Sequence, residues 1–328
     1  MGSTASWSAD IYDRTSAGRL RSGTTSYTDK INSGEASVEA NPIMDILDHD
    51  KNQPRIRESR DSKNHPHSIP IIVGFDDTGS MGENPYLVSK DLKKLFSLLQ
   101  RQSFIEDPQI AVCAYGDMYK DYVPIQFGQF ESGNEIDEEL DSLYIEHGGG
   151  GNDGETSALI PYYASKYVQT DAWDKRHRRG YMFLIGDECS LDLSADGLRQ
   201  YLGEDRKQSV SAKQAFKMAS KKWDIYFLLI DNWQAEAQHS RTKYSSYIGE
   251  DHVITLQSGE QTAATIAAII GAKEKTTNAS ELSGELVAAG FDNDTALQVS
   301  KATKELYYTD SGDTVAVNTE NVGDLDLS

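Results

Sequence analysis

The sequence predicts a doubly wound α/β fold, in which helices flank a mostly parallel sheet. Short apolar segments rich in β-branched and aromatic residues alternate along the chain with segments of helical periodicity. Such apolar segments are typical of parallel strands, because both faces of a parallel sheet are buried. Aspartates and glycines directly follow several of these segments, at the ends of strands where open α/β sheets bind ligands.

The first predicted strand, residues 69–75, leads into a loop with an unusual set of polar side chains. The strand ends at Asp76, and Thr78 and Ser80 follow at alternate positions, among glycines that allow a tight turn. One carboxylate and two hydroxyls are hard oxygen donors of the kind that Mg²⁺ accepts, with waters in the remaining positions. The alternative is that Asp76 and Ser80 only cap the next helix. The spacing, the buried strand and the glycines occur together, and this combination favours the metal site.

Helices and strands alternate after this loop. The helix expected at residues 84–104 has its apolar residues on one stripe at three- and four-residue spacing. Residues 109–115 form a second buried strand, and residues 122–127 form an edge strand because Pro124 cannot donate to a neighbouring strand. Further helices are predicted at residues 135–145, 156–167, 194–202, 211–221, 261–273, 281–289 and 295–306, a helical turn at 244–248, and strands at 181–185, 223–230 and 252–256.

The loop sequence Asp76-Asp77-Thr78-Gly79-Ser80-Met81 resembles the metal-ion-dependent adhesion site (MIDAS) of von Willebrand factor A (vWA) domains. That family has the pattern Asp-x-Ser/Thr-x-Ser after the first strand of a Rossmann-like sheet. The resemblance covers residues 67–275. It implies a bound Mg²⁺, for which Mn²⁺ or Ca²⁺ can substitute, and a partner protein whose Asp or Glu completes the coordination. It also implies a non-catalytic protein–protein interaction module.

Two later loops match the family's site in part. Asp187 follows a buried strand, at the position where the family has an Asp that approaches the metal, often through water. Where the family has a Gly-Gly-Thr turn with a further ligand, this chain has four glycines at residues 148–151, and the threonine is displaced. The resemblance places Asn152 or Asp153 at the ligand position, with Thr156 as another candidate.

Composition limits the partners and the compartment. The formal net charge of −20 makes free nucleic acid an unsuitable partner and suits a divalent cation or a basic protein. The two cysteines do not make a disulfide framework. No segment is long and apolar enough for a membrane helix, and no signal-peptide core follows the polar beginning of the chain. We therefore expect a cytoplasmic protein without membrane contact.

The two ends of the chain differ from the middle. Residues 1–66 contain few apolar residues, and we expect an extended arm that is disordered or ordered only against a partner. Residues 276–328 are expected to form a small helical segment, packed as a cap on the sheet domain, and an acidic tail.

An enzyme is the main alternative to a binding module. Mg²⁺-dependent phosphatases and phosphotransferases of the haloacid-dehalogenase type also carry their motif after the first strand. They require Asp-x-Asp, and the residue two positions beyond Asp76 is Thr78. The sequence therefore favours binding without catalysis. Bacterial and phage-like vWA proteins of the cytoplasm often resemble partner subunits of AAA+ ATPases, including MoxR and chelatase systems, or stress-response proteins of the tellurite-resistance group. The resemblance therefore implies an adaptor in an AAA+ ATPase or stress-response system, with an AAA+ ATPase as one partner class, and the residues do not select among these systems.

Overall fold

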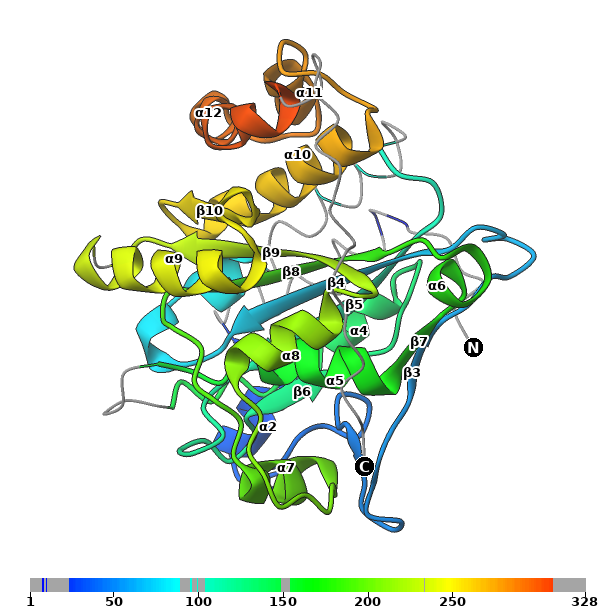
Figure 1. Ribbon diagram of the computed structural model, residues 1–328, viewed down its shortest axis with the longest axis vertical. Coiled ribbons are helices and arrows are strands. Elements are labelled where there is room, and N and C mark those ends of the chain that lie inside the picture. Colours follow the sequence, from blue (N-terminus) through cyan, green and yellow to red (C-terminus); the bar gives the residue numbers. More distant parts are fainter. Residues whose placement is uncertain are drawn as a thin grey trace, which may run out of the picture.

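Six strands in the described part of the chain form one sheet in the order β10-β9-β8-β4-β5-β6 (Figure 1). The computed structural model describes residues 24–88, 104–148, 154–232 and 234–308, with residues 8, 10, 95 and 99. All pairs are parallel except that β6 is antiparallel to β5 at one edge. The strands are β4 (Ile69–Asp76), β5 (Pro108–Tyr115), β6 (Ile125–Phe127), β8 (Gly180–Gly186), β9 (Trp223–Ile230) and β10 (Val253–Leu256). This sheet confirms the predicted fold class, and Pro124 correctly indicated the edge strand.

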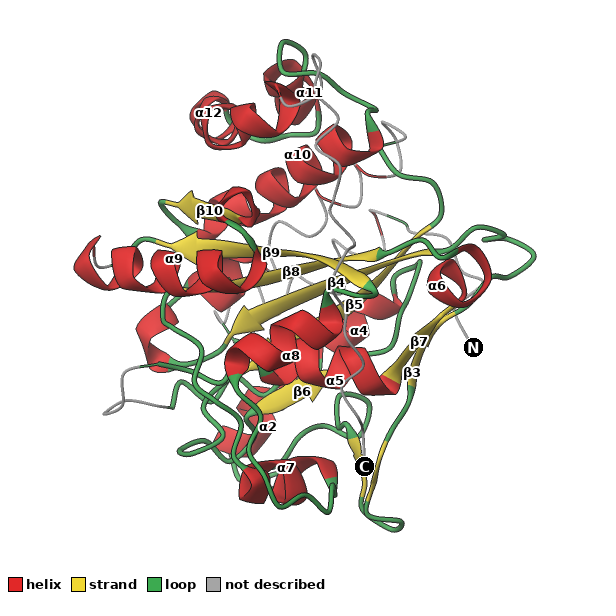
Figure 2. Ribbon diagram, viewed as in Figure 1, coloured by secondary structure: helices red, strands yellow, loops and turns green. Residues whose placement is uncertain are grey.

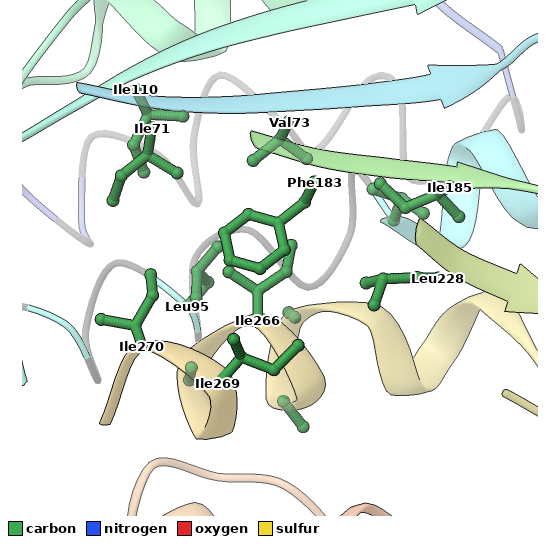
Figure 3. Close-up of a cluster of buried hydrophobic side chains, with 14 of the residues drawn as sticks. Ile71, Val73, Leu95, Ile110, Phe183, Ile185, Leu228, Ile266, Ile269 and Ile270 are labelled. Atoms are coloured by element: carbon green, nitrogen blue, oxygen red, sulfur yellow. The ribbon is translucent and has the colours of Figure 1, made fainter. Parts of the chain in front are cut away.

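Both faces of the sheet are buried, which explains the continuous apolar character of its strands. Every residue of β4 and β5 is buried. Because successive side chains point to opposite faces, Ile71 and Val73 belong to one apolar cluster and Ile72 belongs to the other. Figure 3 shows part of the first cluster, where Phe183 of β8 lies between the other strands and Ile266 of a covering helix.

Helices form a layer on each side of this sheet (Figure 2). The Ile71 cluster is covered by α10 (Thr262–Glu274) and α4 (Glu135–Asp141), and by the helical residues Val88, Leu95 and Leu99. The opposite cluster is covered by α5 (Leu159–Tyr167), α7 (Ala195–Leu202), α8 (Ala212–Ala219) and α9 (Gln234–Ile248). The remaining elements on the sheet domain are β7 (Val168–Thr170), α6 (Asp171–Arg176) and the 3₁₀ turns Gly79–Met81, Glu250–His252 and Gly259–Gln261.

Local side chains explain where several helices begin. The hydroxyl of Ser194 accepts a hydrogen bond from Gly197 N at the start of α7, and Ser211 accepts one from Gln214 N at the start of α8. Both helix starts agree with the sequence prediction. The prediction of only a helical turn at residues 244–248 was wrong, because this turn is the end of the longer helix α9.

Residues 24–66 lie against the sheet domain rather than apart from it. Helix α2 (Ser26–Asn32) is held by the hydroxyls of Thr25 and Thr28, which both donate to the carbonyl of Leu143. Farther along, the carbonyl of Met44 accepts from the backbone N–H of Phe127 in the edge strand β6. The other elements are β1 (Leu47–Asp48), β2 (Gln53–Pro54) and β3 (Arg57–Ser59), which pairs in parallel with β7. The predicted arm thus lies against its own domain between residues 24 and 66.

Two short helices follow the sheet domain, as predicted. They are α11 (Leu282–Ala288) and α12 (Asn293–Tyr308), and they pack on the outer side of α10 (Figure 1). Leu286, Phe291 and Val299 join the same apolar cluster as α10, so this segment is a cap on the domain. The predicted acidic tail begins beyond the last described residue. None of the helices in the described ranges has both the length and the apolar character needed to span a membrane.

Candidate metal centre

The predicted site lies where the chain connections of the sheet diverge. Strand β4 is central, with β5 on one side and β8 on the other, and the chain reaches β8 only after leaving the β5 side. Open α/β sheets bind ligands outside the carboxyl ends of the strands at such a switch point. Asp76 is the last residue of β4, and Asp187 comes directly after β8. The fold therefore brings these two carboxylates to one edge.

A continuous chain of hydrogen bonds joins the predicted ligand residues. One oxygen of Asp76 accepts from the backbone N–H of Thr78 at 2.9 Å and from its hydroxyl at 2.6 Å. The hydroxyls of Thr78 and Ser80 lie 3.2 Å apart, and that of Ser80 donates to Asp187 at 3.0 Å. The other oxygen of Asp187 accepts from Asn232 Nδ2 at 3.0 Å. The structure thus brings Asp76, Thr78, Ser80 and Asp187 together.

Two further predicted ligands, Asn152 and Asp153, lie outside the described residues, so the structure does not place them. The alternative, a helix cap, is not what the structure shows, since Asp76 binds Thr78 while Ser80 binds Thr78 and Asp187. Neither side chain accepts from the first turn of the helix at residue 84 in the described part of the chain.

The acidic groups of this edge are buried without cationic partners. Asp76 and Asp77 are each 1% exposed, and among the described residues no lysine or arginine pairs with either of them or with Asp187. Burial raises the pKa of Asp76 well above its usual range, and the charge of Asp187 raises it further. Burial and the charge of Asp76 do the same to Asp77. A divalent cation is a counter-ion that fits this arrangement of carboxylates.

Backbone geometry fixes the loop that carries Thr78 and Ser80. Gly79 N donates to the carbonyl of Gly148 at 2.9 Å, and a Cβ at residue 79 would lie 3.2 Å from the carbonyl of His147. Gly82 has φ of 54°, a left-handed conformation that favours glycine. Ser80 nevertheless remains exposed, so a cation bound here would face solvent on one side.

Thr156, the remaining candidate ligand, has a structural role instead. Its buried hydroxyl donates to the carbonyl of Gly116 at 2.7 Å and accepts from Met118 N at 2.9 Å. It therefore joins the start of α5 to the loop after β5.

Sequence reasoning missed two residues of this centre, Glu155 and Asn232. Glu155 N donates to the carbonyl of Cys189, which follows β8, while Thr156 N donates to Gly116, which follows β5. Because β4 lies between β5 and β8, residues 155–156 cross the end of β4. The only signal in the sequence that could have indicated Glu155 was its position next to the displaced Thr156. The only signal for Asn232 was its position shortly after a predicted strand.

The Glu155 side chain is buried among the same acidic groups. It is 5% exposed, and its Oε2 atom has no hydrogen-bond partner. Burial raises its pKa far above the usual range, and the nearby charge of Asp76 raises it further. In the described ranges no three acidic, histidine or cysteine side chains already form a metal cage, so the candidate centre depends on hydroxyl oxygens as well as carboxylates.

The fold and the site together define a doubly wound α/β protein with an acidic, hydroxyl-lined centre at its switch point. No family model matches the sequence. No curated protein matches it either.

Several solved structures are similar in fold. The pilus adhesin SpaC of Lactobacillus rhamnosus GG is 12% identical over 66% of this chain and 32% of its own, with a TM-score of 0.45. This chain thus spans about a third of the length of SpaC. The vWF domain of the type V pili tip protein Mfa5 of Porphyromonas gingivalis is 10% identical over 64% of this chain and 94% of its own, with a TM-score of 0.40. BatB, a conserved hypothetical protein of Bacteroides thetaiotaomicron, is 10% identical over 64% of this chain and 100% of its own, with a TM-score of 0.38.

Proposed function

We propose that this protein is a non-catalytic, metal-dependent protein–protein interaction module of the vWA type. Asp76, Thr78 and Ser80 hold one Mg²⁺, and Asp187 contributes directly or through water; Mn²⁺ and Ca²⁺ are substitutes. The observation that carries the proposal is the buried carboxylate of Asp76, which pairs with no cationic side chain among the described residues. It begins a chain of oxygen atoms that reaches the surface at Ser80.

The partner is a protein that presents an Asp or Glu side chain to the bound ion. Mg²⁺ prefers six oxygen ligands and retains waters readily, so four protein donors leave positions that an external carboxylate can take. The exposed Ser80 marks the side from which a partner reaches the ion. The family resemblance suggests that this chain is an adaptor in the cytoplasm. Its partner would be an AAA+ ATPase of the MoxR or chelatase kind, or a component of a stress-response system.

Calorimetry with Mg²⁺ and Mn²⁺ tests the proposal directly. Wild-type protein should bind one ion, and Asp76→Ala should bind none while remaining folded. Asp196→Ala is a matched control, because Asp196 on α7 is exposed and pairs only with neighbouring Arg199. The proposal fails when wild type binds no ion at millimolar concentration, or when Asp76→Ala binds it as wild type does.

Turnover of a generic phosphate ester with Mg²⁺ tests the alternative, a phosphatase or phosphotransferase. We expect no turnover, because Thr78 occupies the place of the second aspartate which that chemistry needs. Capture of proteins from a lysate with and without EDTA then identifies the partner once ion binding is established.

A further inference from the structure

The backbone around Glu155 is held from both sides. A Cβ at Gly154, where φ is 144°, would lie 2.5 Å from the carbonyl of Cys189, so only glycine fits there. Glu155 N donates to that same carbonyl at 2.9 Å, and the carbonyl of Glu155 accepts from Leu191 N at 2.8 Å. Thr156 is fixed to Gly116 on the other side. The position of Glu155 over the end of β4 is therefore set by the fold, as a preorganised ligand requires.

The largest electrostatic effects of neighbouring residues on the Glu155 carboxylate come from other acidic residues. The charges that act on Glu155 come from Asp76, Asp117, Glu188 and Asp121, in that order. No ion pair to Glu155 exists in the described part of the chain, and its Oε2 atom is buried without a hydrogen bond. Burying an unpaired carboxylate is strongly unfavourable, so its charge has to be neutralised by a proton or by a bound cation. A glutamate here is explained by a cation that binds it.

We propose that Glu155 is a direct ligand of the cation held by Asp76, in place of the threonine that the vWA pattern has in this turn. The assignment rests on the proposed function and adds a third carboxylate to its ligand set. Thr156 does not take this role, because its hydroxyl joins Gly116 to Met118. Because no three acidic side chains in the described ranges form a metal cage, Asp187 contributes through water. The chain then supplies four direct oxygen donors, and an octahedral Mg²⁺ keeps positions for water and for the carboxylate of a partner.

Glu155→Gln in the full chain tests the assignment, with Glu188→Gln as a matched control. Both changes remove one negative charge from the same edge, but Glu188 lies on the loop after β8 and is only partly buried. Calorimetry with Mg²⁺ and Mn²⁺ alone should show binding at least about tenfold weaker for Glu155→Gln. Loss of one long-range charge in Glu188→Gln should weaken binding by less than about threefold, since water and salt screen it.

Thermal unfolding without added ions gives a second readout. Glu155→Gln should melt no lower than wild type, because the raised pKa of Glu155 keeps its ion-free side chain neutral, as glutamine is. Saturating Mg²⁺ should raise the melting temperature of Glu155→Gln less than that of wild type. Equal ion affinity in Glu155→Gln and Glu188→Gln, or a lower melting temperature for ion-free Glu155→Gln, overturns the assignment and leaves the proposed function standing. Wild type without ion binding overturns both.

Discussion

Replacing Thr156 by valine should destabilise the fold by about 1 kcal/mol. The hydroxyl is fully buried and makes two hydrogen bonds, so valine, which has nearly the same shape, removes both. The carbonyl of Gly116 keeps a second donor, Thr156 N at 3.1 Å. Met118 N would lose the side-chain oxygen that it binds in the structure. A buried N–H without a partner costs about 1–3 kcal/mol. The additional buried methyl group of valine returns about 0.8 kcal/mol.

Urea unfolding of wild type, Thr156→Val and Thr156→Ser measures this cost. Serine keeps the hydroxyl and should lose less than half as much stability as valine, and its Mg²⁺ affinity should equal that of wild type. A loss below about 0.5 kcal/mol in Thr156→Val would refute the reasoning. Loss of ion binding in Thr156→Val without loss of stability would also refute it, because Thr156 would then be a ligand rather than a structural residue.

The hydrogen bonds of Asn232 and His252 each lead to a further prediction. Asn232→Ala should weaken Mg²⁺ binding about fivefold in calorimetry, because it removes a bond of about 1 kcal/mol that orients Asp187; unchanged affinity would contradict this role. Burial lowers the pKa of His252, but hydrogen bonds to Asp224 and Asp251 outweigh it and raise the pKa above the usual 6.5. The stabilisation from His252 is thus complete below about pH 6.5 and lost as the pH rises through the raised value. His252→Gln should therefore cost more stability at pH 5.5 than at pH 8.5 in urea unfolding, and equal costs would contradict the pairing.

The sequence allowed the sheet and one part of the site to be predicted because their signals are local. Strand β4 and its loop lie within one short stretch, so Asp76, Thr78 and Ser80 could be found from spacing alone. Asp187 could be placed because parallel strands end at one edge. Helix α9 was underestimated because its apolar residues do not form a continuous stripe.

Long-range backbone contacts explain what was missed. Glu155 belongs to the centre because residues far apart in sequence, Gly116 and Cys189, fix the two sides of its backbone. The N-terminal segment has few apolar residues apart from a short island at residues 42–47, of which Met44 and Ile46 are buried in the two apolar clusters of the sheet domain. It is held to the domain by hydrogen bonds such as that of Tyr163, whose hydroxyl donates to the carbonyl of Arg55. Hydrogen bonds between residues far apart in the sequence cannot be predicted from a local sequence pattern.

Because loops far apart in the sequence meet at the centre, ion binding should stabilise several of them at once. The loops after β4, β5, β8 and β9 meet at the centre, and their acidic side chains repel one another in the ion-free protein. An ion that binds only the folded state adds stability, about 2.7 kcal/mol at one hundred times its dissociation constant. The apolar clusters beneath are already complete, with Ile71, Ile72 and Val73 fully buried. The added stability should therefore slow hydrogen exchange most in these four loops, where repulsion is relieved, and least within the strands.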